Sequence, residues 1–164
     1  MPFVARTYMN YLTRYCQTFS QALGIMIGVG FDQWTKKIAV LQLSFYESYP
    51  VLFNMVKFHL VYNAGAAYGI FQNQRWFLVG VGIVMMISAV IFRRTLIQSV
   101  WSHVGLMGIV IGTIGNTIDR IRLGYVVDFI DITIIPVFNI ADMCITLGVG
   151  CFIIEIAVNR YRHQ

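Results

Sequence analysis

The stretch WFLVGVGIVMMISAVIF, residues 76–92, contains 17 consecutive positions without a charged side chain. A run this long and this apolar is typical of a helix that crosses a bilayer. Three other stretches are nearly free of charge: residues 15–31, 95–118 and 137–158. The sequence therefore predicts an all-α integral membrane protein with four transmembrane helices. We expect the spans at about residues 19–39, 75–93, 97–118 and 138–158.

The composition supports this fold class. Of the 164 residues, 58% are hydrophobic and 12% are charged, and the mean hydropathy is +0.70. Soluble domains carry roughly 25% charged residues, and disordered chains combine low hydrophobicity with high charge, so both classes are excluded. The net charge of +5 is explained by basic residues beside membrane spans, and we expect no nucleic-acid partner. The chain is expected to be one domain, residues 1–164.

An even number of spans places both termini on one side of the membrane. Six of the seven acidic residues, all except Glu155, then fall on the opposite side. The basic residues on the terminal side lie in short flanks: Arg6, Arg14, Arg93, Arg94, Arg160 and Arg162. The other six basic residues fall on the opposite side, so the count alone does not set the orientation. Because the positive-inside rule applies to short flanks, we expect cytoplasmic termini. Residues 1–31 could instead be a signal peptide, but no cleavage-site pattern follows them, and we expect a retained helix.

Residues 40–74 form the one sizeable segment outside the spans. Apolar and polar side chains alternate over residues 56–62, which predicts a strand. The following segment, residues 63–69, is rich in small residues that allow close approach of the backbone. We expect only a short loop between Arg120 and Pro136.

In the first and third spans, the spacing of the polar side chains predicts which of them share one face of the helix. Asp32 and Lys36 are four residues apart and are predicted to form an ion pair that supports the end of the first helix. The third span has one stripe of small and polar residues: Gly105, Gly108, Gly112, Gly115, Asn116 and Asp119. The glycines are explained by helix packing, whereas polar groups at membrane depth indicate function.

Two acids from different segments, Asp128 and Asp142, are expected on the same membrane face. Asn139 and Asp142 have the spacing of a helix cap, which is an alternative role for Asp142. Two neighbouring carboxyl groups cannot both ionise easily, so that one acts as base and the other as acid on a water molecule. With Asn116, Asn139 and Arg120 as donors, this is the minimal equipment of an aspartic peptidase.

The sequence lacks the residue patterns that zinc-dependent and serine hydrolases require. The three histidines are scattered, and the sequence contains no HExxH, Gly-x-Ser-x-Gly or P-loop motif, so we expect no metal and no cofactor. A small proton- or ion-coupled transporter or channel subunit is the alternative function, with the aspartates as a relay. Transporters hold such groups near the bilayer midplane, whereas these lie at one edge. A purely structural subunit leaves Asn116 and Asp128 unexplained.

The chain resembles the lipoprotein signal peptidases, the type II signal peptidases of bacteria. Five blocks carry the resemblance: residues 32–36 (DQWTK), 63–68 (NAGAAY), 115–120 (GNTIDR), 126–129 (VVDF) and 138–142 (FNIAD). Members often have a second glycine at Ile111 and a phenylalanine at Tyr68. The interval from Asp128 to Asp142 is short for the family, which leaves the substrate preference open.

The resemblance implies a four-helix aspartic endopeptidase of the bacterial cytoplasmic (inner) membrane with its site on the extracytoplasmic side. Its substrate would be a prolipoprotein, cut on the N-terminal side of a diacylglyceryl-modified cysteine. The strand before Asn63 would form an extracytoplasmic β-cradle, and the segment from Asn63 a lid. The expected partners are this substrate, membrane lipids and the inhibitor globomycin, and we expect a monomer.

The resemblance also implies a role for each site residue. Asp128 and Asp142 become the catalytic dyad. The substrate-orienting residues become Asn63, Asn116, Arg120 and Asn139. The structural supports become Asp32, Lys36 and Asp119.

Overall fold

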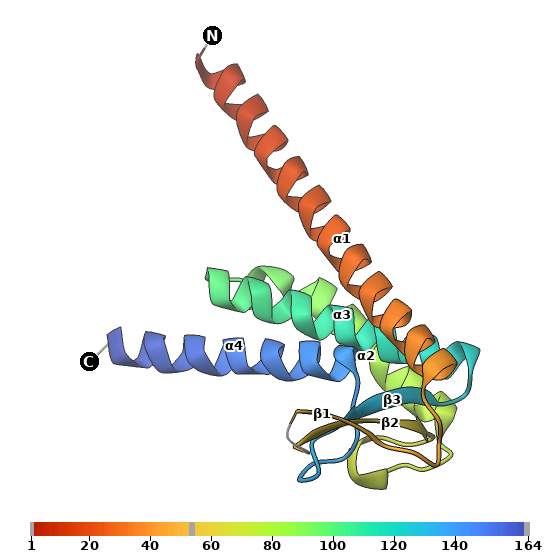
Figure 1. The fold of residues 1–164 in the computed structure, drawn as a ribbon. Coiled ribbons are helices and arrows are strands. Elements are labelled where there is room, and N and C mark those ends of the chain that lie inside the picture. The colour runs from red at the N-terminus through yellow and green to blue at the C-terminus, as the bar shows by residue number, and fades with distance from the viewer. Residues whose placement is uncertain (1, 53–54, 163–164) are drawn as a thin grey trace.

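The computed structural model describes the backbone of residues 2–52 and 55–162 (Figure 1). Side chains are described for residues 18–51, 55–66 and 68–161, so those of Arg6, Arg14 and Arg162 lie outside the described part. The helices in these ranges are α1 (Pro2–Gln42), α2 (Arg75–Leu96), α3 (Val100–Arg122) and α4 (Ile140–Arg162). The strands are β1 (Tyr49–Leu52), β2 (Val56–Asn63) and β3 (Val126–Asp131), and a short 3-10 turn spans Ala67–Gly69.

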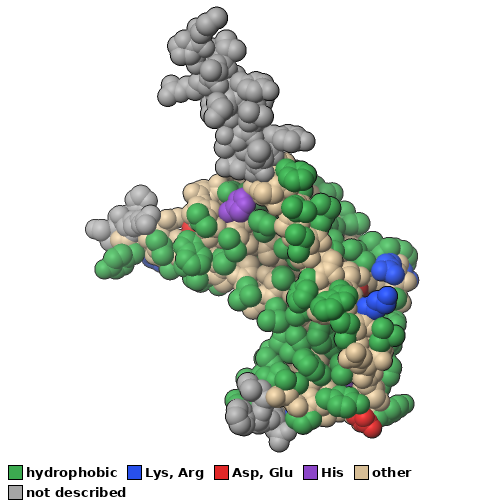
Figure 2. Space-filling model, turned by 45° about the horizontal axis from the view of Figure 1, so that its top comes forward, with side chains coloured by type: hydrophobic (Ala, Val, Ile, Leu, Met, Phe, Trp, Pro, Cys, Tyr) green, Lys and Arg blue, Asp and Glu red, His purple; other side chains and the backbone are tan. Residues whose placement is uncertain are grey.

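Three of the described helices, α2, α3 and α4, are long and apolar enough to cross a membrane. Helix α1 has 41 residues and carries Asp32, Lys36 and Lys37 near its end. Hydrophobic side chains cover much of the surface that Figure 2 shows, as expected where lipid replaces water. The protein is mainly helical and membrane-like. Helices α2, α3 and α4 start and end within four residues of the segments expected for them, whereas α1 begins at Pro2, 17 residues before the expected first span.

The small sheet differs from the expectation in one respect. Its order is β1-β2-β3 with antiparallel pairing, and β3 comes from the connection between α3 and α4. The expectation of a plain short loop from Arg120 to Pro136, and of a sheet made only between the first two helices, is wrong. Residues 126–131 form a strand because β2 supplies the ladder, in a register that pairs Val61 with Asp128. Strand β2 lies more than sixty residues earlier in the sequence, so the local pattern around residues 126–131 does not indicate this pairing.

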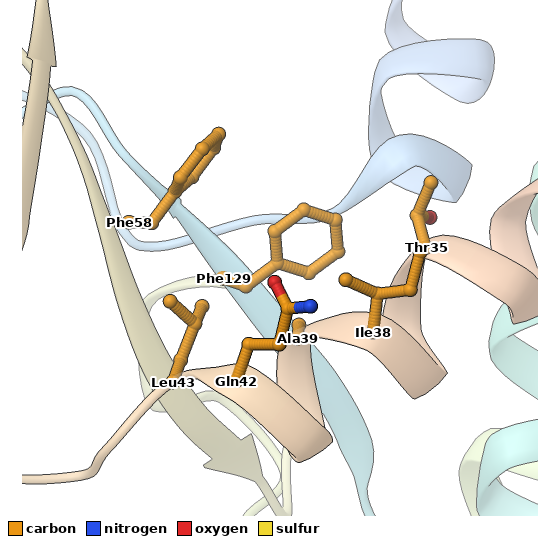
Figure 3. Close-up of a pocket in the computed structure, with 7 residues that line it drawn as sticks. All are labelled: Thr35, Ile38, Ala39, Gln42, Leu43, Phe58 and Phe129. Atoms are coloured by element: carbon orange, nitrogen blue, oxygen red, sulfur yellow. The ribbon is translucent and has the colours of Figure 1, made fainter.

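The end of α1 packs on the sheet through a small apolar core. Ala39 of α1 contacts Leu60 of β2 and Val127 and Phe129 of β3, and all four are buried. Beside this core, the ring of Phe129 borders a pocket of about 220 Å³ between α1 and the sheet (Figure 3). Burial of these side chains fixes β3 relative to α1, and Asp128 lies between the two core residues of β3.

Helices α3 and α4 approach each other closely along the predicted glycine stripe. A methyl group at Gly108 would lie 2.7 Å from the carbonyl oxygen of Cys144 on α4. Gly112 faces the carbonyl of Ala141 in the same way, and Gly115 faces the carboxylate of Asp32. The packing interpretation of these glycines is confirmed, and the same contact brings Asn116 next to the first turn of α4.

We predict that Gly108→Ala lowers the melting temperature in detergent, because the added methyl group meets backbone. Overpacking costs about 1–3 kcal/mol, more than the roughly 1 kcal/mol that alanine gains over glycine in a helix. Gly150→Ala on α4 is the control, since a methyl group there has open space around it. Equal melting temperatures for the two variants would contradict the close contact between α3 and α4.

Candidate active site

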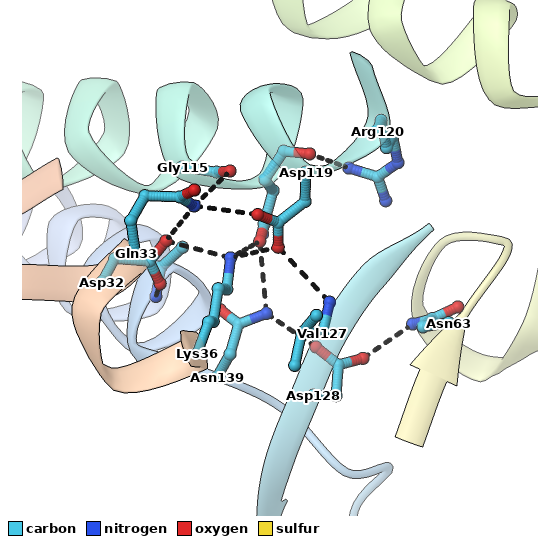
Figure 4. A network of polar contacts seen from close by, with 12 residues as sticks. Asp32, Gln33, Lys36, Asn63, Gly115, Asp119, Arg120, Val127, Asp128 and Asn139 are labelled. Atoms are coloured by element: carbon cyan, nitrogen blue, oxygen red, sulfur yellow. Dashed lines mark hydrogen bonds and ion pairs between the residues drawn. The ribbon is translucent and has the colours of Figure 1, made fainter. Parts of the chain in front are cut away.

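Polar side chains gather where the end of α1, the end of α3 and the start of α4 meet the sheet (Figure 4). All nine site residues expected from the sequence lie in this region. Asp128 is on β3, which the apolar core holds in place, and Asp142 is in the first turn of α4. Asp128 is 2% exposed and Asp142 is half-buried.

Lys36 lies at the centre of the supporting contacts. Its Nζ lies 2.9 Å from Asp32 Oδ2 and 2.8 Å from Asp119 Oδ2, and it donates to Asn116 Oδ1 at 3.0 Å. The predicted pair of Asp32 with Lys36 is confirmed. A buried ammonium is costly unless it is paired and hydrogen-bonded, and here three acceptors from α1 and α3 surround it. Lys36 therefore ties these two helices together.

The two carboxylates beside Lys36 also bind backbone groups. Asp32 Oδ1 accepts from the N–H of Ala141 at 2.9 Å, one of the donors that a helix start leaves without a partner. Asp119 Oδ2 accepts from the N–H of Val127 at 3.3 Å. Gln33, which the sequence analysis did not single out, donates to Asp119 Oδ1 at 2.8 Å. These bonds fix the start of α4 and the start of β3 to the ion-pair cluster.

The orientation of Asn116 follows from its neighbours. Lys36 only donates, so the amide oxygen of Asn116 faces it and the amide NH₂ points the other way. That NH₂ donates to Asp142 Oδ1 at 2.7 Å. Asn116 thus connects the buried ammonium to one of the two expected catalytic acids.

Asn139 is oriented by the helix cap. Its Oδ1 accepts from the N–H of Asp142 at 3.0 Å, and its own N–H donates to Asp142 Oδ2 at 3.3 Å, which is the reciprocal pattern of a capping box. The Asn139 amide NH₂ is left to donate to Asp128 Oδ1 at 2.6 Å and to Asn116 Oδ1 at 3.2 Å. The predicted cap is confirmed, and it also links the two acids through one amide.

Asp128 is held by donors on both oxygens. Asn63 at the end of β2 donates to Asp128 Oδ2 at 3.0 Å, opposite the bond from Asn139. Burial, and next the negative charge of Asp142, raise the pKa of Asp128 to about 7, while the bonds from Asn63 and Asn139 oppose this rise. At neutral pH, Asp128 is therefore divided between its protonated and ionised forms, as a proton-transferring group requires.

Arg120 holds the segment after β2 and makes no hydrogen bond to either acid. Its guanidinium donates to the carbonyl of Gly65 at 2.9 Å and to that of Asn116 at 3.4 Å. A side chain at position 65 would meet the carbonyl of Ile70 at 2.8 Å, so glycine is needed for this close turn. The segment that begins at Asn63 is thereby fastened beside Asp128.

Two adjoining hollows open onto the acids. Asp142 lines one of about 530 Å³, whose walls include Met143 and Leu147 of α4. Asp128 lines the other, of about 330 Å³. Both hollows are bordered by Asn63, Tyr68, Pro136 and Val137. The site is thus open to a bulky, partly apolar ligand. Among the described residues, no group of three or more His, Cys, Asp or Glu side chains is placed to hold a metal.

A helical membrane protein in which a buried acid is linked to a half-buried one, beside an apolar hollow, has the architecture of a membrane aspartic peptidase. Residues 24–158 match the family Peptidase_A8, described as Signal peptidase (SPase) II. The chain is 40% identical over 141 residues to the lipoprotein signal peptidase of Brevibacillus brevis, covering 83% of this chain and 93% of that one. It is 43% identical over 123 residues to that of Caldanaerobacter subterraneus subsp. tengcongensis, covering 73% and 83%.

A solved bacterial membrane enzyme, determined by the in meso method at 2.3 Å resolution, has a similar fold. The TM-score is 0.80 at 31% sequence identity, over 88% of this chain and 92% of that chain. Together these similarities show that the chain belongs to the signal peptidase II family. It is a hydrolase, a peptidase of the aspartic type.

We predict that Asp32→Ala lowers the melting temperature strongly while activity per folded molecule falls much less. The change removes a partner of Lys36 and the acceptor for the N–H of Ala141, and breaking a buried ion pair costs about 3–5 kcal/mol. Asp131→Ala is the control, since Asp131 makes only a local bond, to the N–H of Thr133. A purified Asp32→Ala protein that is fully stable and inactive would instead place Asp32 in the mechanism.

Proposed function

We propose that this protein removes the signal peptide from prolipoproteins and cuts on the N-terminal side of a diacylglyceryl-modified cysteine. The relatives named above are lipoprotein signal peptidases, and the family supports this substrate class. The observation that carries the proposal is the linkage of Asp128 and Asp142 through the amide of Asn139, beside a hollow with apolar walls.

In the proposed mechanism, Asp128 is the acid and Asp142 the base. Asp142 lies at a helix start, where the dipole favours negative charge, and accepts two N–H bonds. It takes a proton from water, whose oxygen attacks the scissile carbonyl, while Asp128 gives its proton to the carbonyl oxygen. The tetrahedral diol then collapses. One of its hydroxyls gives its proton to Asp128 and becomes the carbonyl, the C–N bond breaks, and the amine of the cysteine takes a proton from Asp142.

The remaining site residues have two proposed roles. Asn63, Asn116, Arg120 and Asn139 orient the acids and the substrate backbone. Asp32, Lys36 and Asp119 support the helix ends that carry those groups. The hydrogen bonds described above support this division. The three asparagines bond the acids, and Arg120 bonds the carbonyl of Gly65 beside them. Asp32 and Asp119 instead accept from backbone N–H groups and pair with Lys36.

We further propose four spans, with α1 as the first, in the cytoplasmic (inner) membrane of a bacterium. Both termini are then cytoplasmic, and the sheet forms a cradle on the extracytoplasmic side, with the segment from Asn63 as a lid. Globomycin is expected to occupy the acids, and the chain is expected to act as a monomer without a cofactor. The chain 1–164 acts as a single domain in this proposal.

The alternative, a proton- or ion-coupled transporter, fits the placement of the acids less well. Coupling groups of transporters lie near the bilayer midplane on interrupted helices. Here Asp128 is on a strand and Asp142 in the first turn of α4, so both lie where the helices end.

We predict that Asp128→Asn and Asp142→Asn each reduce cleavage of a lipid-modified prolipoprotein by at least about 10³-fold, because acid and base act as one unit. The double variant should be no worse than either single one. The assay compares proteins at matched folded concentration, with an unmodified substrate as a second arm.

Asp131→Asn is the matched control and should keep most of the activity, since this acid lies outside the cluster on the same strand. Near-normal turnover by Asp142→Asn would leave Asp142 as the cap of α4 alone. That result would remove the two-acid mechanism.

We predict that kcat/KM falls above a pH of about 7, close to tenfold per pH unit, as Asp128 loses the proton that it must donate. Asn63→Ala should move this fall to higher pH. Asn63 donates to the ionised carboxylate, so that its removal raises the pKa of Asp128 further. Asn159→Ala, at the far end of α4, should leave the profile unchanged, and a shift to lower pH for Asn63→Ala would contradict the assignment.

A further inference from the structure

A groove of about 560 Å³ lies between the ends of α1 and α3 and shares no lining residue with the two hollows at the acids. Helix α1 contributes Trp34, Lys37 and Leu41 to its walls, and Arg122 and Leu123 lie on the opposite side. Nothing in the proposed cleavage reaction uses this groove.

The rim of the groove combines unpaired positive charge with exposed apolar surface. Lys37 and Arg122 are exposed, and neither makes an ion pair with any side chain that the structure describes. Trp34 is 57% exposed and Leu41 73%. Figure 2 shows basic side chains lying together at one edge of a surface that is otherwise largely hydrophobic.

The floor of the groove does not cancel this positive charge. It contains Lys36 and Asp119, which form an ion pair at 2.8 Å, and Lys36 also pairs at 2.9 Å with Asp32, which does not line the groove. This buried cluster carries one net negative charge, against two cations at the rim. Both oxygens of Asp119 are already occupied by N–H donors or by Lys36. The lining residues therefore carry three cations and one anion, and the free charge at the rim belongs to Lys37 and Arg122.

Favourable placement of basic residues at helix ends explains only part of this arrangement. Arg122 is in the last turn of α3, where the helix dipole favours a cation. Lys37 lies five residues before the end of α1, outside the last turn, so the helix dipole does not explain a cation at this position. Neither position explains why the side chains of Trp34 and Leu41 line the same groove.

We propose that the groove binds an anionic phospholipid of the surrounding bilayer. The phosphate lies between Lys37 and Arg122, and an acyl chain runs along Trp34 and Leu41. Lipid is the occupant that supplies both negative charge and hydrocarbon at the membrane surface, and basic side chains attract its anionic head group.

Brominated lipids test this proposal directly, because bromine quenches a tryptophan that it contacts. In a Trp76→Phe/Trp101→Phe background, Trp34 is the remaining tryptophan of the chain. We expect brominated phosphatidylglycerol to quench Trp34 at a several-fold lower mole fraction than brominated phosphatidylcholine. The double variant Lys37→Gln/Arg122→Gln should abolish this preference.

Arg93→Gln/Arg94→Gln is the matched control, since it removes two exposed cations at the C-terminal end of α2, outside the groove, and should leave the preference intact. Equal quenching by the two lipids, or a preference that survives Lys37→Gln/Arg122→Gln, would overturn the proposal. So would displacement of the lipid by inorganic phosphate alone. Native mass spectrometry of the unaltered chain and the two double variants, counting bound phosphatidylglycerol, gives a second measurement if the tryptophan background does not fold. Neither readout requires cleavage, so the result is independent of the proposed peptidase function.

Discussion

The architecture depends on keeping one buried ammonium group charged. Lys36 is 3% exposed, and an ammonium in such surroundings is costly unless it is paired and hydrogen-bonded. Asp32, Asn116 and Asp119 each place an oxygen within 3.0 Å of its Nζ. Since the three acceptors come from two helices, satisfying this charge sets how α1 and α3 lie against each other.

The contacts of Lys36 also determine how the two acids are hydrogen-bonded, because the side-chain amides between them can satisfy their neighbours in only one orientation. Lys36 donates to Asn116, so Asn116 must turn its NH₂ toward Asp142. The backbone N–H of Asp142 donates to Asn139, so Asn139 must turn its NH₂ toward Asp128. Both acids therefore receive N–H donors whose direction is set by other contacts. Asn116 is oriented by Lys36, and Asn139 by the backbone at the start of α4. Under the proposed mechanism, donors held in this way need not reorganise when charge moves between the acids, which is how a preorganised site lowers a barrier.

Local spacing made part of this site predictable. The four-residue interval between Asp32 and Lys36 and the three-residue interval between Asn139 and Asp142 each specify a contact within one turn of helix. The strand that carries Asp128 was missed, because residues 126–131 form a ladder only with β2, more than sixty residues earlier. Gln33 was missed for the same reason. Its partner Asp119 lies 86 residues away, and a single glutamine near a helix end gives no local signal.

The position of the acids at the helix ends has a physical reason under the proposed function. A substrate with two acyl chains cannot bring its modified cysteine into water, because each CH₂ removed from lipid costs about 0.8 kcal/mol. Acids deep in the bilayer would avoid that cost but would lack water, the second reactant. Acids above the surface would have water but no lipidated substrate. A strand fastened to helix ends by Ala39, Val127 and Phe129 places Asp128 between these limits, and the buried ion pairs below it keep the helix ends from separating. Under the proposed function, the polar network thus holds the two acids at the level where lipid and water meet.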